Sequence, residues 1–347
     1  MNKETLHISN WSVFIPPFIE FVKEHFDYKR HVFLITDGNT GHKLNSDANV
    51  FFSKRTLVSR LMHYIRVVIK MNQAKKVILH GLFDPVLILI LFFMPWLLKK
   101  CYWVMWGGDL YVYQLGERNW IWKLREFFRR PVIRNMGYLV NGTTGDVDLA
   151  RKWYRAKGQH ISCFNYPSNI YKHYDVKTKT HDTVNIQLGN SADPTNQHIE
   201  ILDQLVRFKE QNIKIFVVLS YGDQDYAKKV ITEGKKKFDD KFIAITEMMP
   251  FEAYLEFLAS IDVAVFNHNR QQAFGNTITL LGLGKKVFLN PASTLNGVFS
   301  EFGIQIFNSK KIELTSLDEV TKQANIAKVK YHFSKDSLVK SLQSWIT

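Results

Sequence analysis

The densest run of hydrogen-bonding side chains in the sequence covers residues 267–276, directly after the apolar segment that ends at Phe266. It holds one histidine, one arginine, two glutamines and three asparagines. Arg270 can bind a phosphate through two parallel hydrogen bonds, and His268 can donate to a phosphate or to a leaving group. Three more side chains could meet sugar hydroxyls: Gln271, Gln272 and Asn276. The run predicts a site for a diphosphate and a sugar, with a solvated loop that caps a helix as the alternative.

A second candidate phosphate site lies at Gly189–Asn196, between a predicted strand and a predicted helix. The small residues Gly189, Asn190 and Ser191 let the backbone approach a phosphate, and a helix N-terminus supplies free N–H groups. The segment matches neither GxGxxG nor the P-loop, which disfavours hydride transfer and NTPase chemistry. An ordinary strand-to-helix turn with an Asp or Ser cap is the alternative.

The next predicted strand ends at Ser220, and Tyr221-Gly222 follows it. Gly222 would allow a turn with positive φ. Tyr221 could stack on a nucleobase, although a surface tyrosine in a turn explains it equally well.

Two carboxylates in the first half of the chain also follow predicted strands. Asp84 lies in the run HGLFDP, which begins at His80, and Asp109 lies in the run WGGDLY. Aromatic rings stack on the apolar faces of sugars, so the second run suits a sugar site, and core packing is an equally good explanation of its tryptophan. The aromatic candidates there are Trp106, Tyr111 and Tyr113, and Gly107-Gly108 would let the chain turn sharply, which places Gly108 with His80 among the acceptor-side residues. We interpret Asp109 as the better candidate for a general base and Asp84 as the second.

The elements that must position these residues alternate between strand and helix along the whole chain. The predicted strands of the second half are near-continuous apolar runs, at Val184–Leu188, Ile213–Ser220, Phe242–Thr246, Asp262–Phe266 and Lys286–Leu289. Such runs, separated by helical stretches, are typical of a doubly wound parallel sheet. Ligands bind beyond the carboxyl ends of the strands in these sheets.

The first half repeats the pattern less regularly. Its predicted strands are Leu6–Ser9, His31–Thr36, Lys76–His80, Tyr102–Met105 and Tyr138–Asn141. Its predicted helices are Pro16–His25, Arg55–Met71, Pro85–Leu98, Ile121–Arg130 and Thr144–Ala156. We therefore predict an α/β protein with two Rossmann-like domains that face a cleft. The domains would cover residues 1–170 and 183–330, and residues 331–347 would form a C-terminal helix that could pack back on the first domain.

The net charge of +14 suggests an anionic partner, and a nucleic acid, an acidic membrane or a diphosphate substrate would each fit. Charge for solubility alone is the alternative. Cys101 and Cys163 are far apart, which argues against a metal knuckle or a disulfide-rich secreted fold. No signal peptide is expected. The apolar run Pro85–Leu98 is shorter than the roughly 20 residues that span a bilayer, so it predicts a buried or interfacial helix.

Two stretches combine basic with apolar residues. No acidic residue lies between Asp47 and Asp84, where seven lysines and arginines accompany apolar residues at helical spacing. A second basic set lies at residues 123–134, among Trp120, Trp122 and two phenylalanines. Such helices are typical of membrane-surface elements, with a solvated helix face as the alternative.

The runs HGLFDP, WGGDLY, LGNSADPTNQH, LSYG and NHNRQQAFGN, in this order, resemble glycosyltransferase family 56, over about His80 to Asn290. Its members add 4-acetamido-4,6-dideoxygalactose from a thymidine-diphosphate donor to lipid-linked precursors of enterobacterial common antigen. The resemblance implies a GT-B architecture, a metal-independent mechanism and peripheral attachment to the cytoplasmic face of the bacterial inner membrane. It also implies that Gly189–Asn196 and His268–Asn276 hold the donor, while WGGDLY and HGLFDP line the acceptor side.

We therefore expect transfer of a deoxy-amino sugar from a nucleotide-diphosphate donor to a polyprenyl-diphosphate-linked saccharide, without a cofactor. Arg270, His268 and the backbone near Gly189 would neutralise the departing diphosphate. Asp109 would deprotonate the acceptor if the reaction inverts the anomeric centre. The DxD-like run at Asp146 is interpreted as helix capping rather than a metal site. Nucleic-acid binding is disfavoured because no known recognition pattern occurs, and the alternative is a non-catalytic protein that binds a nucleotide sugar or a lipid-linked glycan.

Overall fold

The computed structural model describes residues 5–36, 47–53, 56–173 and 181–347. The chain divides into two compact units. Unit 1 comprises residues 1–168 and 335–347, and unit 2 comprises residues 169–334. Among the described residues, no helix combines the length and the apolar character that a membrane span needs.

Unit 1 is built on a seven-stranded parallel sheet in the order β3-β2-β1-β4-β5-β6-β7. Its strands are β1 (Thr5–Asn10), β2 (His31–Thr36), β3 (Val50–Phe52), β4 (Lys76–His80), β5 (Cys101–Val104), β6 (Tyr138–Val140) and β7 (Gln159–Ile161). The central strands β1, β2 and β4 are almost entirely buried, as the predicted apolar runs require. The short edge strands β3 and β7 were not predicted.

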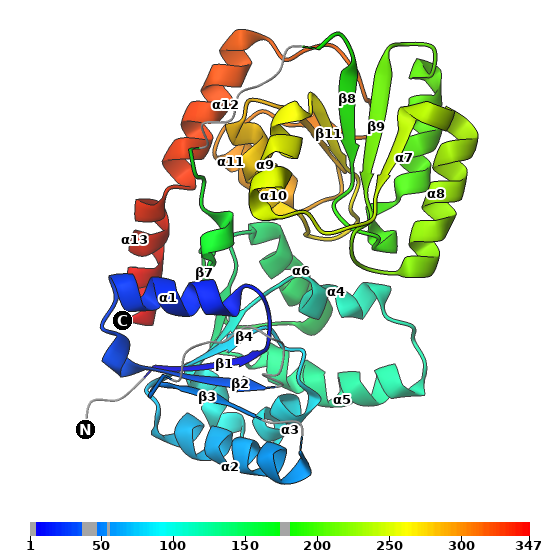
Figure 1. Ribbon diagram of the computed structural model, residues 1–347. Helices are drawn as coiled ribbons and strands as arrows, with labels where there is room; N and C mark the ends of the chain where they lie inside the picture. The colour runs from blue at the N-terminus through cyan, green and yellow to red at the C-terminus, as the bar shows by residue number, and fades with distance from the viewer. Residues whose placement is uncertain (1–4, 37–46, 54–55, 174–180) are drawn as a thin grey trace. The chain divides into compact units, whose positions relative to one another are not determined.

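The helices of unit 1 lie on both faces of this sheet (Figure 1). They are α1 (Ile15–His25), α2 (Leu57–Gln73), α3 (Pro85–Phe93), α4 (Gly108–Leu115), α5 (Trp120–Arg134), α6 (Thr144–Tyr154) and α13 (Lys335–Ile346). Figure 1 shows α1 over one face and α2 and α3 over the other. The predicted helix Pro85–Leu98 ends at Phe93, because Pro95 starts a 3₁₀ turn that runs to Lys100. Helix α4 was not predicted.

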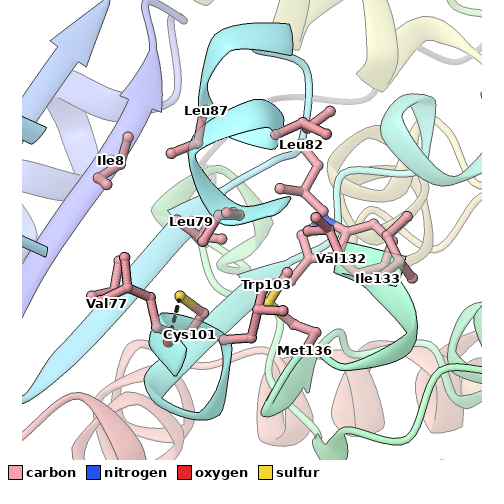
Figure 2. Close-up of a cluster of buried hydrophobic side chains, with 14 of the residues drawn as sticks. Ile8, Val77, Leu79, Leu82, Leu87, Cys101, Trp103, Val132, Ile133 and Met136 are labelled. Carbon is pink, nitrogen blue, oxygen red and sulfur yellow. Dashed lines mark hydrogen bonds between the residues drawn. The ribbon is translucent and has the colours of Figure 1, made fainter. Parts of the chain in front are cut away.

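The core of unit 1 lies between the sheet and the helices α2, α3, α5 and α6. Figure 2 shows side chains of β1, β4 and β5 converging with those of α3 and α5 on Trp103, which is fully buried. Cys101 lies beside it, and its thiol donates to the carbonyl of Leu97. Burial raises the pKa of Cys101 to about 12, so the thiol stays protonated and acts as an apolar side chain.

Helix α13 packs on unit 1 rather than on the unit that precedes it in the sequence. The hydroxyl of Thr5 donates to the carbonyl of Ile346 over 3.3 Å, and the ring of Trp345 stacks on Tyr102 with 5.7 Å between the ring centres. The first and last described elements of the chain are therefore held in the same unit.

Unit 2 has a six-stranded parallel sheet in the order β10-β9-β8-β11-β12-β13. Its strands are β8 (Val184–Leu188), β9 (Ile213–Val218), β10 (Phe242–Ile245), β11 (Val263–Phe266), β12 (Lys286–Leu289) and β13 (Phe307–Asn308). Its helices are α7 (His198–Leu205), α8 (Gln224–Phe238), α9 (Phe251–Ser260), α10 (Phe274–Gly282), α11 (Leu295–Glu301) and α12 (Glu319–His332). The five longer strands lie within two residues of their predicted bounds. The strand order changes direction at β8, which lies between β9 and β11. The loops after β8 and β11 are therefore neighbours at the carboxyl ends of the strands.

Candidate functional site

Asn190 is the residue at which three loops of unit 2 meet. Its side-chain oxygen accepts hydrogen bonds from His268 Nε2 at 2.9 Å and from Gln272 Nε2 at 3.0 Å, both in the loop after β11. Its side-chain nitrogen donates to the hydroxyl of Tyr221, after β9, over 3.0 Å. The structure thus brings together candidate residues that are 78 and 82 positions apart in the sequence.

Two glycines allow the loops to approach this closely. Gly189 has φ +65°, and a Cβ there would lie 2.2 Å from His198 Nε2. Gly222 has φ +113°, and a Cβ there would lie 2.8 Å from the carbonyl carbon of Ala192. Ala192 and Gly222 form an isolated parallel bridge beyond the ends of β8 and β9. Any side chain at either position would push the loops apart.

Arg270 forms an ion pair with Asp193, with 2.7 Å between Nη2 and Oδ2. Burial alone raises the pKa of Asp193, but hydrogen bonds from Thr195 and Arg270 outweigh it and hold the pKa below its usual value. Thr195 also donates to Gln272 over 3.2 Å. Asp193 therefore orients the one arginine of this loop, and Gln272 ties that pair to Asn190.

His268 is buried, and its Nε2 must carry the proton because it faces an amide oxygen. Burial, with Arg270 and His198 nearby, lowers the pKa of His268 to about 3. The ring is therefore neutral at pH 7 and already committed to Asn190. This geometry favours a positioning role for His268 over direct contact with a leaving group.

The remaining donor-side candidates surround this network. Ser191 is buried and accepts from Gln272 Nε2 over 3.1 Å. Gln271 and Asn276 are half-buried, and Asn276 lies in the first turn of α10. That helix begins after Ala273, which has φ +57°, a conformation that costs a non-glycine residue about 1 kcal/mol. The strained residue aims the N-terminus of α10 toward the same loop.

In unit 1, Asp109 joins neighbouring loops through its hydrogen bonds, as Asn190 does in unit 2. Its Oδ2 accepts from the backbone N–H of Leu82 at 3.0 Å and from the indole of Trp103 at 2.7 Å. Its Oδ1 accepts from the backbone N–H of Trp106 at 2.9 Å, and Arg129 donates to its carbonyl. Only 1% of the side chain is exposed, and burial raises its pKa against these lowering contacts. The geometry favours a role in joining the loops after β4 and β5 over a role as base.

Asp84 and Tyr111 are also held by intramolecular contacts. Asp84 caps α3 by accepting from the N–H groups of Val86 and Leu87, and it accepts from Tyr64 at 2.8 Å. Tyr111 is buried and donates to Asp146 at 2.9 Å, so its ring is not available to stack on a sugar in this structure. Asp146 lies in the first turn of α6, and its carboxylate binds Tyr111.

Trp106 and His80 are linked through a residue that the sequence did not single out. The indole of Trp106 donates to the hydroxyl of Tyr166 at 2.7 Å, and the same hydroxyl lies 2.7 Å from His80 Nδ1. The chain continues from His80 Nε2 to His7 at 3.1 Å and from His7 to His31 at 2.9 Å. Trp106 and Gly108 stay half-buried at the open end of this chain.

The three histidines lie on the adjacent strands β4, β1 and β2, and the ring of Phe18 from α1 packs edge-on against His7 and His80. Burial lowers the pKa of His80 to about 3 and that of His31 to about 4, and it holds the pKa of His7 well below its usual value. Sequence reasoning missed His7, His31 and Tyr166 because each is a single residue outside any motif along the chain. For the histidines, the pairing register of β4, β1 and β2 is the signal that could have shown them to be neighbours.

In the described parts of the chain, no group of three or more His, Cys, Asp or Glu side chains could hold a metal ion. His198 Nε2 is buried without a hydrogen-bond partner beside Gly189, and Tyr226 lies 3.3 Å from the other ring nitrogen. The candidate donor site is thus built from amides, hydroxyls, neutral imidazoles and one arginine.

Two Rossmann-like units of this kind are the architecture of GT-B glycosyltransferases, and solved structures of that class superpose on the whole chain. A UDP-forming α,α-trehalose-phosphate synthase from Burkholderia xenovorans has a TM-score of 0.67 at 9% identity, over 99% of both chains. Alr3699/HepE of Anabaena, in complex with UDP and glucose, has 0.64 at 12%, over 99% of both. WaaG, a glycosyltransferase involved in lipopolysaccharide biosynthesis, has 0.60 at 12%, over 98% of both.

A family model assigns the chain within this class. The model of 4-alpha-L-fucosyltransferase, glycosyl transferase group 56, matches residues 20–346. The chain therefore belongs to glycosyltransferase family 56 and is a transferase, which confirms the resemblance seen in the sequence motifs.

The buried histidines predict a loss of stability in mild acid. Their folded pKa values are lowered, so below the unfolded value of about 6.5 the unfolded state binds more protons than the folded state. Stability is then complete above about pH 6.5 and falls as pH decreases toward the folded values. At pH 5 each histidine with a folded pKa near 3 or 4 costs about 2 kcal/mol. Urea unfolding at pH 7.5 and pH 5.0 measures this difference.

A matched pair of variants tests the source of that loss. His80→Asn should reduce the difference between the two pH values by about 2 kcal/mol, whereas His173→Asn, at an exposed position, should leave it unchanged. A free energy of unfolding that is equal at both pH values would contradict the assignment.

Asp109→Asn tests whether that side chain is structural. In either orientation its amide nitrogen would face an N–H donor, so we expect a loss of about 2–4 kcal/mol in the free energy of unfolding. Asp148→Asn, at an exposed position in the DxD-like run, should change stability by less than about 0.5 kcal/mol. Unchanged stability of Asp109→Asn together with lost transfer would return the role of base to Asp109.

Proposed function

We propose that this chain transfers a deoxy-amino sugar similar to 4-acetamido-4,6-dideoxygalactose from a thymidine-diphosphate donor. The acceptor would be a polyprenyl-diphosphate-linked saccharide of surface polysaccharide biosynthesis, such as an enterobacterial common antigen or O-antigen intermediate. Membership of the group 56 family supports a fucosyl-type transfer. The observation that carries the donor assignment is the convergence of Arg270, Gln272 and Tyr221 around Asn190 at the carboxyl edge of the unit 2 sheet.

The chemistry follows from what these groups can do at that edge. The guanidinium of Arg270 would bind the donor diphosphate while Asp193 holds it in place. The N–H groups at the start of α10 would add partial positive charge as the nucleoside diphosphate leaves. Protein donors would thus replace a divalent ion, so the proposed mechanism is metal-independent. Tyr221 is 49% exposed and offers a ring face to the base.

On the acceptor side, Trp106 is the best-placed candidate. Its ring is half-buried, and its edge is fixed by Tyr166, Phe14 and Phe83. A fixed, partly exposed ring suits stacking on a saccharide. Asp109 stays the predicted base for an inverting reaction, and it would act on the acceptor only if its contacts to Leu82 and Trp103 rearrange.

An anionic membrane surface at the cytoplasmic face of the inner membrane would present the acceptor. Helices α2, α3 and α5 contribute buried side chains to one core cluster, so they lie on the same face of the unit 1 sheet. Their outer sides, with the 3₁₀ turn that follows α3, expose large apolar groups: Leu57, Leu61, Ile65, Ile69, Phe93, Trp96, Trp120, Leu124 and Phe127. Exposed cations lie between them, among them Arg60, Arg66, Lys123 and Arg125. Basic helices with exposed apolar groups are typical of membrane-surface binding.

Arg270→Ala tests the donor site. We expect kcat/KM for the nucleotide sugar to fall about 100-fold, since a charge-assisted contact to the diphosphate is lost in the transition state. Arg270→Lys should recover part of this, and Lys229→Ala on the exposed face of α8 should have no effect. Transfer to a polyprenyl-linked acceptor and calorimetric binding of thymidine diphosphate measure both steps. Unchanged affinity and turnover would remove Arg270 from the site.

A double variant of α2 tests the membrane surface. Leu61→Ser with Ile65→Ser should lower binding to vesicles that contain phosphatidylglycerol about tenfold, because two exposed apolar side chains no longer insert. Val320→Ser, at an exposed position of α12, is the matched control. Co-sedimentation measures both, and equal binding of the two proteins would reject this face as the contact.

A further inference from the structure

A basic cavity lies at the end of the unit 1 sheet where the strands begin, and the acceptor-side residues lie at the end where the strands stop. Its volume is about 750 Å³, and it is formed where α5 and α6 end. Five cationic side chains line it, and no acidic residue does: Arg130, Arg134, Lys152, Arg155 and Lys157. Residues 134–137 lead into the start of β6 and residues 155–158 into the start of β7, whereas Trp106 and Asp109 follow the end of β5.

Among the residues that the structure describes, most of this charge has no counter-ion. Arg130 pairs with Glu126, with 3.4 Å between Nε and Oε2. The other four side chains are exposed, and within the described parts of the chain none of them forms an ion pair with a carboxylate. Four like charges around one cavity repel each other, so an anion that carries several oxygens would stabilise the arrangement.

Helix dipoles explain only part of the cluster. Cations in the last turn stabilise a helix, which accounts for Arg134 in α5 and Lys152 in α6. Lys157 lies beyond α6, and Arg155 occupies the left-handed position after the helix, with φ +56°, where glycine is the usual residue. The turn at Arg155 lets the N–H of Lys157 donate to the carbonyl of Arg134 over 3.0 Å. The backbone therefore holds the ends of both helices, with their cations, against each other.

The cavity continues the exposed apolar side of α5. Residues 120, 124, 127, 131 and 134 recur at intervals of three and four, so they share one side of that helix. Trp120, Leu124 and Phe127 are exposed, and Pro131 and Arg134 line the cavity. An apolar stripe that runs into a cationic cavity matches a phospholipid, which has acyl chains next to a phosphate.

We propose that this cavity binds the phosphate headgroup of an anionic phospholipid. The inference rests on the proposed membrane surface and adds to it a specific headgroup site, separate from the donor and acceptor residues. Arg134 and Arg155 would bond the phosphate oxygens, and Lys157 would add a third charge. The site fixes which part of unit 1 contacts the headgroup layer, in addition to the apolar contact of α2, α3 and α5.

The test compares two triple variants of the full chain that lose the same net charge. One is Arg134→Gln, Arg155→Gln and Lys157→Gln, and the control is Lys229→Gln, Lys235→Gln and Lys236→Gln, all exposed on α8. Binding is measured by co-sedimentation with phosphatidylcholine vesicles that contain phosphatidylglycerol, and with vesicles of phosphatidylcholine alone. We expect the cavity variant to bind the anionic vesicles at least tenfold more weakly and the control to bind within twofold of the unaltered chain. Equal losses in both variants would show unspecific charge attraction and would overturn the proposal.

Two further measurements separate the remaining explanations. Pyrophosphate in solution tests a free anion: if it raises the melting temperature of the unaltered chain but vesicle binding is the same with and without the cavity charges, the lipid proposal is wrong. The single variant Lys157→Gln, at an exposed position after the helix, should fold normally and lose three- to fivefold in anionic vesicle binding. Full binding by this variant and by the triple variant would overturn the proposal. A chain that transfers no sugar but shows these losses would refute the proposed function and leave the headgroup site standing.

Discussion

One buried polar side chain in each unit holds together loops that no strand ladder joins. In unit 2 the amide of Asn190 bonds His268, Gln272 and Tyr221, from the loops after β9 and β11. In unit 1 the carboxylate of Asp109 accepts N–H donors from the loops after β4 and β5 and from the indole of Trp103 within β5. An unsatisfied buried donor costs about 1–3 kcal/mol. The loops of each unit therefore keep their positions only while Asn190 or Asp109 accepts the hydrogen bonds that they donate.

The two central residues differ in kind, because Asn190 carries a neutral amide and Asp109 an ionisable carboxyl group. Asn190 is neutral, and its partners His268 and Gln272 are neutral too, so the positive charge beside this network comes from Arg270, which Asp193 partly balances. An incoming diphosphate would therefore meet an arginine that is already oriented and only partly neutralised. Asp109 is buried, which raises the pKa of its carboxyl group, while the indole of Trp103, the nearby Arg129 and two backbone N–H groups act in the opposite direction. Both of its carboxylate oxygens accept hydrogen bonds within the unit, so a role as base requires these contacts to rearrange.

The sequence was enough to predict the sheets but not the contacts between loops. The buried strands are apolar runs, so β2, β4, β8 and β12 could be placed to the residue. Strands β3, β7 and β13 have two or three residues each, too few to show a pattern. The donor-side residues of the unit 2 loops were chosen by their position after strands, and the structure brings several of them together. The sequence did not predict where the side chains of Asp109 and Tyr111 point, because both lie in the unpredicted helix α4. The direction of that helix depends on the turn at Gly107, where φ is +82°.

The net charge of +14 finds its explanation away from the candidate donor site. That site has one arginine, whereas the amino ends of the unit 1 strands are preceded by pairs of cations: Lys29-Arg30, Lys75-Lys76 and Lys99-Lys100, and Arg155 and Lys157 before β7. A parallel sheet has two unlike edges, because all its strands end on one side and begin on the other. The loops at the carboxyl ends carry the polar groups that a sugar needs, and the amino ends are free to carry unbalanced charge. The proposed headgroup site would use one part of that charge, where the cations at the ends of α5 and α6 line a single cavity.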